Sequence, residues 1–87
     1  MSEIVALQKK YDLPASLAKL LLMLADRDTV TAYDIEEYRG LAKEAKSAVW
    51  RLRRVMAEHG IDIKSRREVG YWMEDSDRET VKAAAGR

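Results

Sequence analysis

The chain has 87 residues, with no cysteine, one histidine and one proline, and 47% of the residues are hydrophobic while 36% are charged. This length suffices for one small domain, and the lack of cysteine excludes disulfides and a zinc site built from cysteine and histidine. The 16 basic and 15 acidic residues give a net charge of +1, so the protein is not uniformly basic. The longest apolar run covers residues 20–25, far short of the roughly 20 residues of a membrane span, and we expect a cytoplasmic protein without membrane contact.

Two helices are predicted at the start of the chain. Ser2 is a typical N-cap, and apolar residues at helical spacing after it predict a short helix over residues 2–12. Pro14 suits the first turn of a second helix. The core stripe of this second helix repeats at i, i+3, i+4 and i+7 and consists of Leu17, Leu20, Leu21 and Leu24.

Leu22 and Met23 lie outside that stripe, which suggests that the first helix or a second subunit covers them. The β-branched residues at 29–31 favour a short extended segment. Thr31 with Asp34 resembles a capping box, and we expect it to begin a third helix over residues 32–38.

The longest periodic segment predicts a fourth helix over residues 41–59, with Gly60 as its C-terminal cap. Its apolar residues fall within about 80° of one direction: Leu41, Ala45, Ala48, Val49, Leu52, Val55 and Met56. The opposite face carries Lys43, Ser47, Trp50 and Arg54, flanked by Lys46 and Arg51. A tryptophan on a polar face leaves much apolar surface in water, so Trp50 either contacts a ligand or packs under a neighbouring element or subunit.

The C-terminal third predicts a hairpin and a short helix. Residues 61–65 alternate apolar and polar as an edge strand does, residues 71–73 can pair back as a second strand, and residues 66–70 would form the loop. Ser76 with Glu79 resembles a capping box for a helix over residues 76–85, after which Gly86 and Arg87 are expected to be frayed.

Catalysis has little support in the sequence. The single histidine, His59, lies at a predicted helix C-terminus, where imidazole commonly interacts with the last carbonyl groups. The four glycines are isolated, so no phosphate-binding loop exists, and the acidic clusters suit helix surfaces and N-termini. We therefore expect no enzyme activity, no metal and no cofactor.

The distribution of charge is more informative than its sum. Between Lys43 and Glu68 there are eight basic and four acidic residues, a balance of +4, whereas the rest of the chain carries −3. A basic face on one helix and on the hairpin after it is typical of a protein that binds phosphates.

The order of helices, short strand and final hairpin is that of a winged helix-turn-helix. Residues 49–56 (VWRLRRVM), 59–63 (HGIDI) and 69–71 (VGY) resemble the end of the DNA-binding domain of OmpR/PhoB-type regulators. The resemblance covers about residues 14–73. It implies a mainly α (α+β) winged helix-turn-helix with a C-terminal two-stranded wing over residues 65–70, in a single domain 1–87 with extra helices at 2–12 and 76–85.

The resemblance also implies the function, a sequence-specific double-stranded DNA-binding protein that regulates transcription and is associated with the nucleoid. Helix 41–59 would enter the major groove, with Arg53 and Arg54 toward phosphates and Arg67 at the wing tip. The side chains toward base edges would be Lys46, Ser47, Trp50 and Arg51. The helical wheel agrees except for Arg53, which it places at the side of the helix. The family commonly has glycine at the place of Glu68, and its N-terminal sheet and receiver domain have no counterpart here, which suggests a free-standing relative. The candidate DNA-contacting residues are Lys43, Lys46, Ser47, Trp50, Arg51, Arg53, Arg54, Arg66 and Arg67.

Two alternatives stay open at this point. Winged helices also serve as protein-interaction modules or assembly subunits, for example in phage packaging or replication, because a fold does not determine a function. In that case Trp50, Leu22, Met23 and Trp72 would be interface anchors. Double-stranded RNA is the other alternative ligand, and homodimerisation is a further hypothesis, because one module reads only a short half-site.

Overall fold

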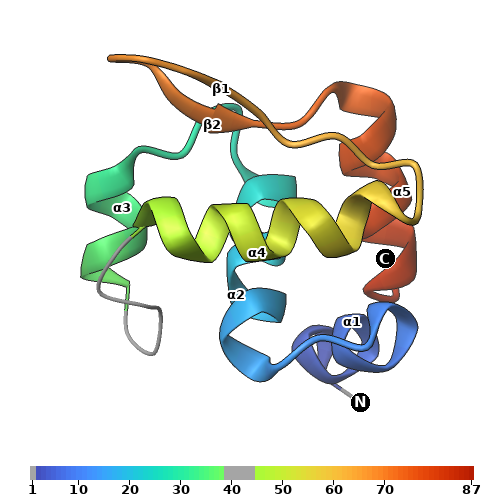
Figure 1. Cartoon of the computed structure of the whole chain (residues 1–87). Helices are drawn as coiled ribbons and strands as arrows, with labels where there is room; N and C mark the ends of the chain where they lie inside the picture. Colours follow the sequence, from blue (N-terminus) through green and yellow to red (C-terminus); the bar gives the residue numbers. More distant parts are fainter. Residues whose placement is uncertain (1, 39–44) are drawn as a thin grey trace.

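The computed structural model describes residues 2–38 and 45–87 and consists mainly of helices with one antiparallel hairpin (Figure 1). The coarse prediction of a mainly α fold with a small β part is confirmed. No helix in the described ranges combines the length and the apolar character needed to cross a membrane. In chain order the elements are α1 (Glu3–Tyr11), α2 (Ala15–Asp26), α3 (Ala32–Glu37), α4 (Ala45–Ala57), β1 (Lys64–Arg66), β2 (Gly70–Trp72) and α5 (Asp75–Ala84).

Helix α2 forms the centre of the core. Helices α1, α4 and α5 all pack against it (Figure 1), and the predicted leucine stripe is buried. Met23 is only 6% exposed and Leu22 is half-buried against the core. The chain itself therefore covers these two residues, and no second subunit is needed to explain them.

The terminal helices are part of this core. Leu7 of α1 and Val81 of α5 are fully buried, and Arg78 of α5 donates from Nε to the carbonyl oxygen of Ala25 at the end of α2 (3.1 Å). Arg87, which the sequence predicted to be frayed, instead forms ion pairs with Glu3 and Asp26. Its guanidinium lowers the pKa of the Asp26 carboxyl.

Side-chain caps delimit the first and third helices as predicted. Ser2 Oγ accepts a hydrogen bond from the N–H of Val5 (3.1 Å). Thr31 and Asp34 form a complete capping box at 3.0 Å in both directions, and the Thr31 N–H holds the pKa of Asp34 below its ordinary value. Glu36 of α3 then accepts a hydrogen bond from the N–H of Ala45 (3.2 Å), which ties α3 to α4.

Two predicted boundaries need correction. The structure ends α4 at Ala57, two residues before the predicted end, because the chain turns over residues 58–60 and Gly60 adopts a φ of +72°. The start of the predicted helix, residues 41–44, lies outside the described residues. The capping box of Ser76 and Glu79 is wrong: α5 begins at Asp75 after Glu74, and no side chain caps it.

The first strand of the hairpin also differs from the prediction. Ile61 and Ile63 are buried, as their alternation indicated, but residues 61–63 have no partner strand. The N–H of Asp62 donates to Asp77 (3.1 Å), and the carbonyl oxygen of Ile63 accepts from Arg53. Pairing begins at Lys64 opposite Trp72, and β2 starts one residue earlier than expected.

A single antiparallel bridge fixes the hairpin to the segment between α2 and α3. The backbone N–H and C=O groups of Val30 and Tyr71 exchange two hydrogen bonds of 2.8 Å each. Gly70 has a φ of +124°, and a Cβ added there would lie 2.5 Å from the carbonyl oxygen of Val30. The close approach therefore requires glycine at position 70.

We expect Gly70→Ala to lower the free energy of unfolding by about 3 kcal/mol, because the new methyl group forces the hairpin away from Val30. Gly60→Ala is the matched control, since Gly60 also has positive φ but nothing lies within 4 Å of an added Cβ. Its loss should be about 1 kcal/mol, from backbone strain alone. Urea unfolding measures both losses, and equal losses would contradict the steric argument.

Candidate nucleic-acid interface

Helix α4 has one buried and one exposed face. Its core side is at most 1% exposed and consists of Ala45, Ala48, Val49, Leu52 and Met56. Val55 is half-buried against the same core, whereas Leu41 and Lys43 lie outside the described residues. The predicted division of this helix into an apolar, buried face and a polar, exposed face is therefore confirmed for the residues that the structure describes.

The exposed face of α4 combines positive charge with one aromatic ring. Lys46, Ser47, Arg51 and Arg54 are exposed, and Trp50 is 56% exposed. The guanidinium carbon of Arg54 lies 4.9 Å from the centre of the Trp50 ring, a cation–π contact. Trp50 thus lies on the solvent side, and no neighbouring element of the described chain buries it.

Arg53 has a different environment from these cations. It is half-buried, its Nε donates to the carbonyl oxygen of Ile63 (2.9 Å), and its Nη2 lies 3.4 Å from Ser65 Oγ. The resemblance to OmpR/PhoB-type domains implied that Arg53 points toward phosphates. The structure instead uses its guanidinium to hold the beginning of the hairpin against α4.

The turn of the hairpin is shorter than the predicted loop. Arg66 belongs to β1 and pairs with Gly70, so only residues 67–69 connect the strands. The N–H of Val69 donates to the carbonyl oxygen of Arg66 (3.1 Å), and Glu68 has a φ of +70°. Glu68 thus occupies the left-handed position that a type II turn normally gives to glycine.

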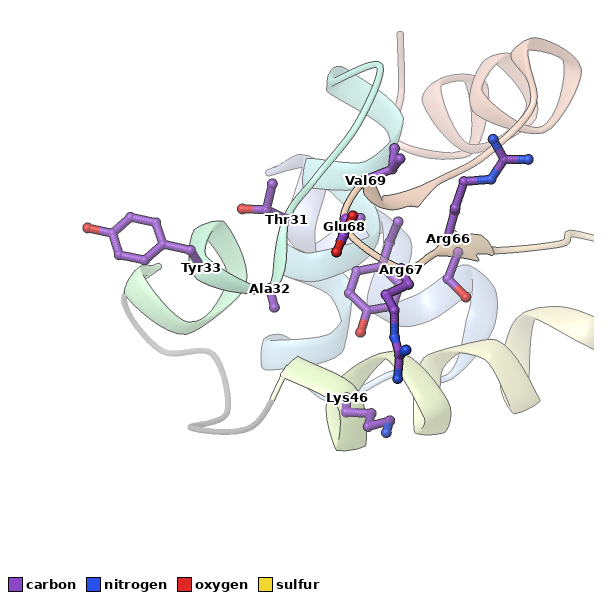
Figure 2. Close-up of a pocket in the computed structure, with 11 residues that line it drawn as sticks. Thr31, Ala32, Tyr33, Lys46, Arg66, Arg67, Glu68 and Val69 are labelled. Atoms are coloured by element: carbon purple, nitrogen blue, oxygen red, sulfur yellow. The ribbon is translucent and has the colours of Figure 1, made fainter.

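This turn and the start of α4 border a common groove of about 500 Å³, which also involves the start of α3. Figure 2 shows Arg67 extending from the turn toward Lys46 of α4, whereas Arg66 points away from α4. Tyr33, 71% exposed, stands at the other side of the groove. The fold therefore brings Lys46 and Arg67 to the same side of the molecule.

The arginines of the described residues fall into two groups. Arg27, Arg78 and Arg87 pair with carboxylates, and Arg53 bonds to a backbone oxygen. In the other group the side chains make neither an ion pair nor a hydrogen bond within residues 2–38 and 45–87, and this group consists of Arg51, Arg54, Arg66 and Arg67. All four lie on the exposed face of α4 or on the hairpin, where their charge is available to a ligand.

The groups that could have suggested catalysis have structural roles. The ring of His59 packs edge-on against the ring of Tyr11, with ring centres 4.7 Å apart. The imidazole therefore makes a contact with α1 as well as lying near the end of α4. Glu74 pairs with Lys64 (3.4 Å), and Asp77 accepts from the backbone. No cluster of metal-binding side chains occurs within the described part of the chain.

Tyr33 is the residue at this surface that the sequence analysis missed. It lies two positions after the N-cap Thr31 and two before the buried Ile35, which places it on the outer side of a short helix. A helical wheel of α3 could have indicated its exposure. Its place beside the hairpin depends on the Val30 bridge, which no local pattern reveals.

Comparison with protein-family models, with curated protein sequences and with solved structures finds no match for this chain. The resemblance to OmpR/PhoB-type domains therefore stays a prediction from the quoted residues.

We expect Glu68→Gly to raise the free energy of unfolding by up to about 1 kcal/mol, because glycine relieves the positive φ at this turn. Glu68→Gln is the control: it removes the charge and keeps the Cβ, so it should leave stability nearly unchanged. Urea unfolding of both variants separates backbone strain from charge. A gain from Glu68→Gln as large as that from Glu68→Gly would contradict the strain argument.

Proposed function

We propose that this protein is a double-stranded DNA-binding protein of the winged-helix kind. In this proposal α4 is the recognition helix in the major groove, and the β1–β2 hairpin is a wing beside it. The observation that carries the proposal is a set of cations on one side of the molecule that have no ion-pair partner in the described ranges: Lys46 and Arg51 on α4, and Arg67 directed from the hairpin toward Lys46 (Figure 2).

The dimensions of α4 suit this ligand. Its 13 described residues span about 20 Å at 1.5 Å per residue. A helix fits into the major groove of B-form DNA, which is about 12 Å wide, whereas the major groove of A-form RNA is too narrow and deep for side chains to read. The exposed helix with charged side chains therefore favours DNA over double-stranded RNA.

The roles of the cations follow from their positions. Lys46 and Arg51 lie on the exposed part of α4, where donors can reach the O6 and N7 acceptors of guanine. Arg67 at the hairpin turn would hold a phosphate beside the groove. Arg53 leaves the set of proposed contacts, because its guanidinium is engaged with residues 63 and 65.

The alternative, a protein-interaction module, has less support. Four residues were expected to be interface anchors. Of these, Met23 is buried, Leu22 and Trp72 are half-buried, and only Trp50 is exposed to solvent. The charged groups of Lys46, Arg51 and Arg54 surround Trp50. Charged residues are depleted at the core of protein interfaces. The hypothesis of a homodimer also has less support, because Leu22 and Met23 pack against the core of the same chain.

Regulation of transcription is the use that we propose for this DNA binding. A single module of this kind covers roughly 600 to 1,000 Å² on DNA, so tandem sites would be needed for high specificity.

Duplexes selected from a random pool, followed by titration at several salt concentrations, test the proposal. Absence of binding to any duplex at low salt would refute it.

Arg51→Ala should weaken binding by about 1 to 3 kcal/mol on the selected duplex and by much less on unrelated DNA, because a base contact carries sequence information. Lys9→Ala is the matched control, since Lys9 is an exposed cation on α1, away from the hairpin (Figure 1). Fluorescence anisotropy with both duplexes gives the comparison. Equal losses for the two variants would contradict the role of Arg51.

Arg67→Ala should weaken binding to all duplexes alike and reduce the salt slope by about one unit, because a phosphate contact releases counterions without reading bases. The Arg67 side chain is exposed and has no ion-pair partner among the described residues, so the unfolding free energy should stay the same. A variant that binds like the parent protein at every salt concentration would show that the hairpin does not contact DNA.

A further inference from the structure

The exposed face of α4 has an apolar hollow within its basic surface. The hollow measures about 550 Å³ and is lined by Lys46, Ser47, Trp50 and Arg51. Its walls are mainly carbon, from the indole ring and the methylene groups of the long side chains. A basic surface that only held phosphates would not need an apolar hollow at its centre.

Arg54 supports the indole that forms one wall. Its guanidinium lies over the Trp50 ring at 4.9 Å, and Arg54 does not line the hollow. In a helix the side chain of residue 50 leans toward residues 46 and 47, so the hollow lies on its N-terminal side and Arg54 on its C-terminal side. The stacking thus restrains the ring before any ligand arrives.

The chemistry of duplex DNA limits what this hollow can meet. Base faces are covered by their neighbours in the stack, so a side chain in the major groove meets only base edges. Among those edges, the C5-methyl group of thymine is the one apolar group, whereas guanine, cytosine and adenine present donors and acceptors. Among the base edges, an indole on a recognition helix therefore finds its apolar partner at thymine.

We propose that Trp50 and its hollow determine specificity by binding the methyl group of a thymine that neighbours a guanine. This inference rests on the proposed DNA-binding function. Arg51 borders the same hollow, and its unpaired guanidinium can donate to the guanine acceptors of the adjacent base pair. The preferred site thus contains a thymine–guanine step in either strand order.

Replacement of thymine by deoxyuridine tests the proposal, because it removes the methyl group and leaves the pairing edge unchanged. In duplexes selected with the parent protein, single deoxyuridine substitutions are made at each thymine. Burial of one methyl group corresponds to about fourfold in affinity. We expect a loss of about this size at one thymine beside a guanine in each site, and no change at the other thymines.

Variants of the protein assign the effect to the hollow. Trp50→Ala should bind thymine and deoxyuridine duplexes equally and keep the salt slope of the parent, because no charge is removed. Trp50→Leu should keep part of the discrimination, since leucine retains apolar surface. Tyr38→Ala is the matched control: it removes an exposed aromatic ring that lines neither the hollow nor the groove beside the hairpin, and it should keep the full fourfold ratio.

The outcomes separate the two proposals. If the parent protein binds the selected duplexes and deoxyuridine has no effect, the proposal that Trp50 binds a thymine methyl group is wrong, while the proposed DNA binding stands. The thymine proposal is also overturned if the Trp50→Ala variant is folded by circular dichroism and still binds thymine duplexes more tightly than deoxyuridine duplexes. Failure of the parent protein to bind any duplex overturns both, and a preference for single-stranded DNA would mean that Trp50 stacks on bases instead.

Discussion

The bridge between Val30 and Tyr71 is the constraint on which the candidate interface depends. Two backbone hydrogen bonds of 2.8 Å attach the hairpin to the segment before α3, and the absence of a side chain at Gly70 permits the approach. With this bridge in place, Arg67 extends toward Lys46 (Figure 2). Without it, the hairpin would be a two-stranded ribbon of three residues a side, which is too small to be stable alone.

A second set of contacts orients the hairpin relative to α4. Arg53 bonds to the carbonyl oxygen of Ile63 and approaches Ser65, while Ile61 and Ile63 are buried in the core. A cation that faces the hairpin thus has a structural role, whereas its neighbours Arg51 and Arg54 face solvent. Successive residues of a helix point about 100° apart, so neighbouring arginines on α4 have different environments.

The terminal helices explain why so small a chain can have a well-covered core. Helix α2 is apolar on more than one side, and α1 and α5 pack against it. Arg78 and Arg87 add hydrogen bonds and ion pairs that connect α5 with α2, and Arg87 also reaches Glu3. This arrangement places the paired arginines away from the exposed face of α4, and it leaves the unpaired ones on the side that we propose meets DNA.

Local patterns in the sequence determined much of this structure. Helical periodicity indicated the buried and exposed faces of α4, and the capping box of Thr31 with Asp34 marked the start of α3. These features depend on residues within one or two turns of each other, so the sequence displays them directly. The same periodicity put Trp50 and the cations beside it on the polar face, but only the structure decided that no neighbouring element of the described chain covers Trp50.

Only the tertiary structure decided the features that join distant residues. The alternation at 61–65 indicated burial correctly, but a pairing partner depends on long-range register, and β1 begins only at Lys64. The role of Arg53, the coverage of Met23 and the ion pairs of Arg87 all require elements far apart in the chain to meet. The sequence alone thus determined which faces are apolar or charged, and the packing of the helices and hairpin decided which charges are neutralised and which remain available to a ligand.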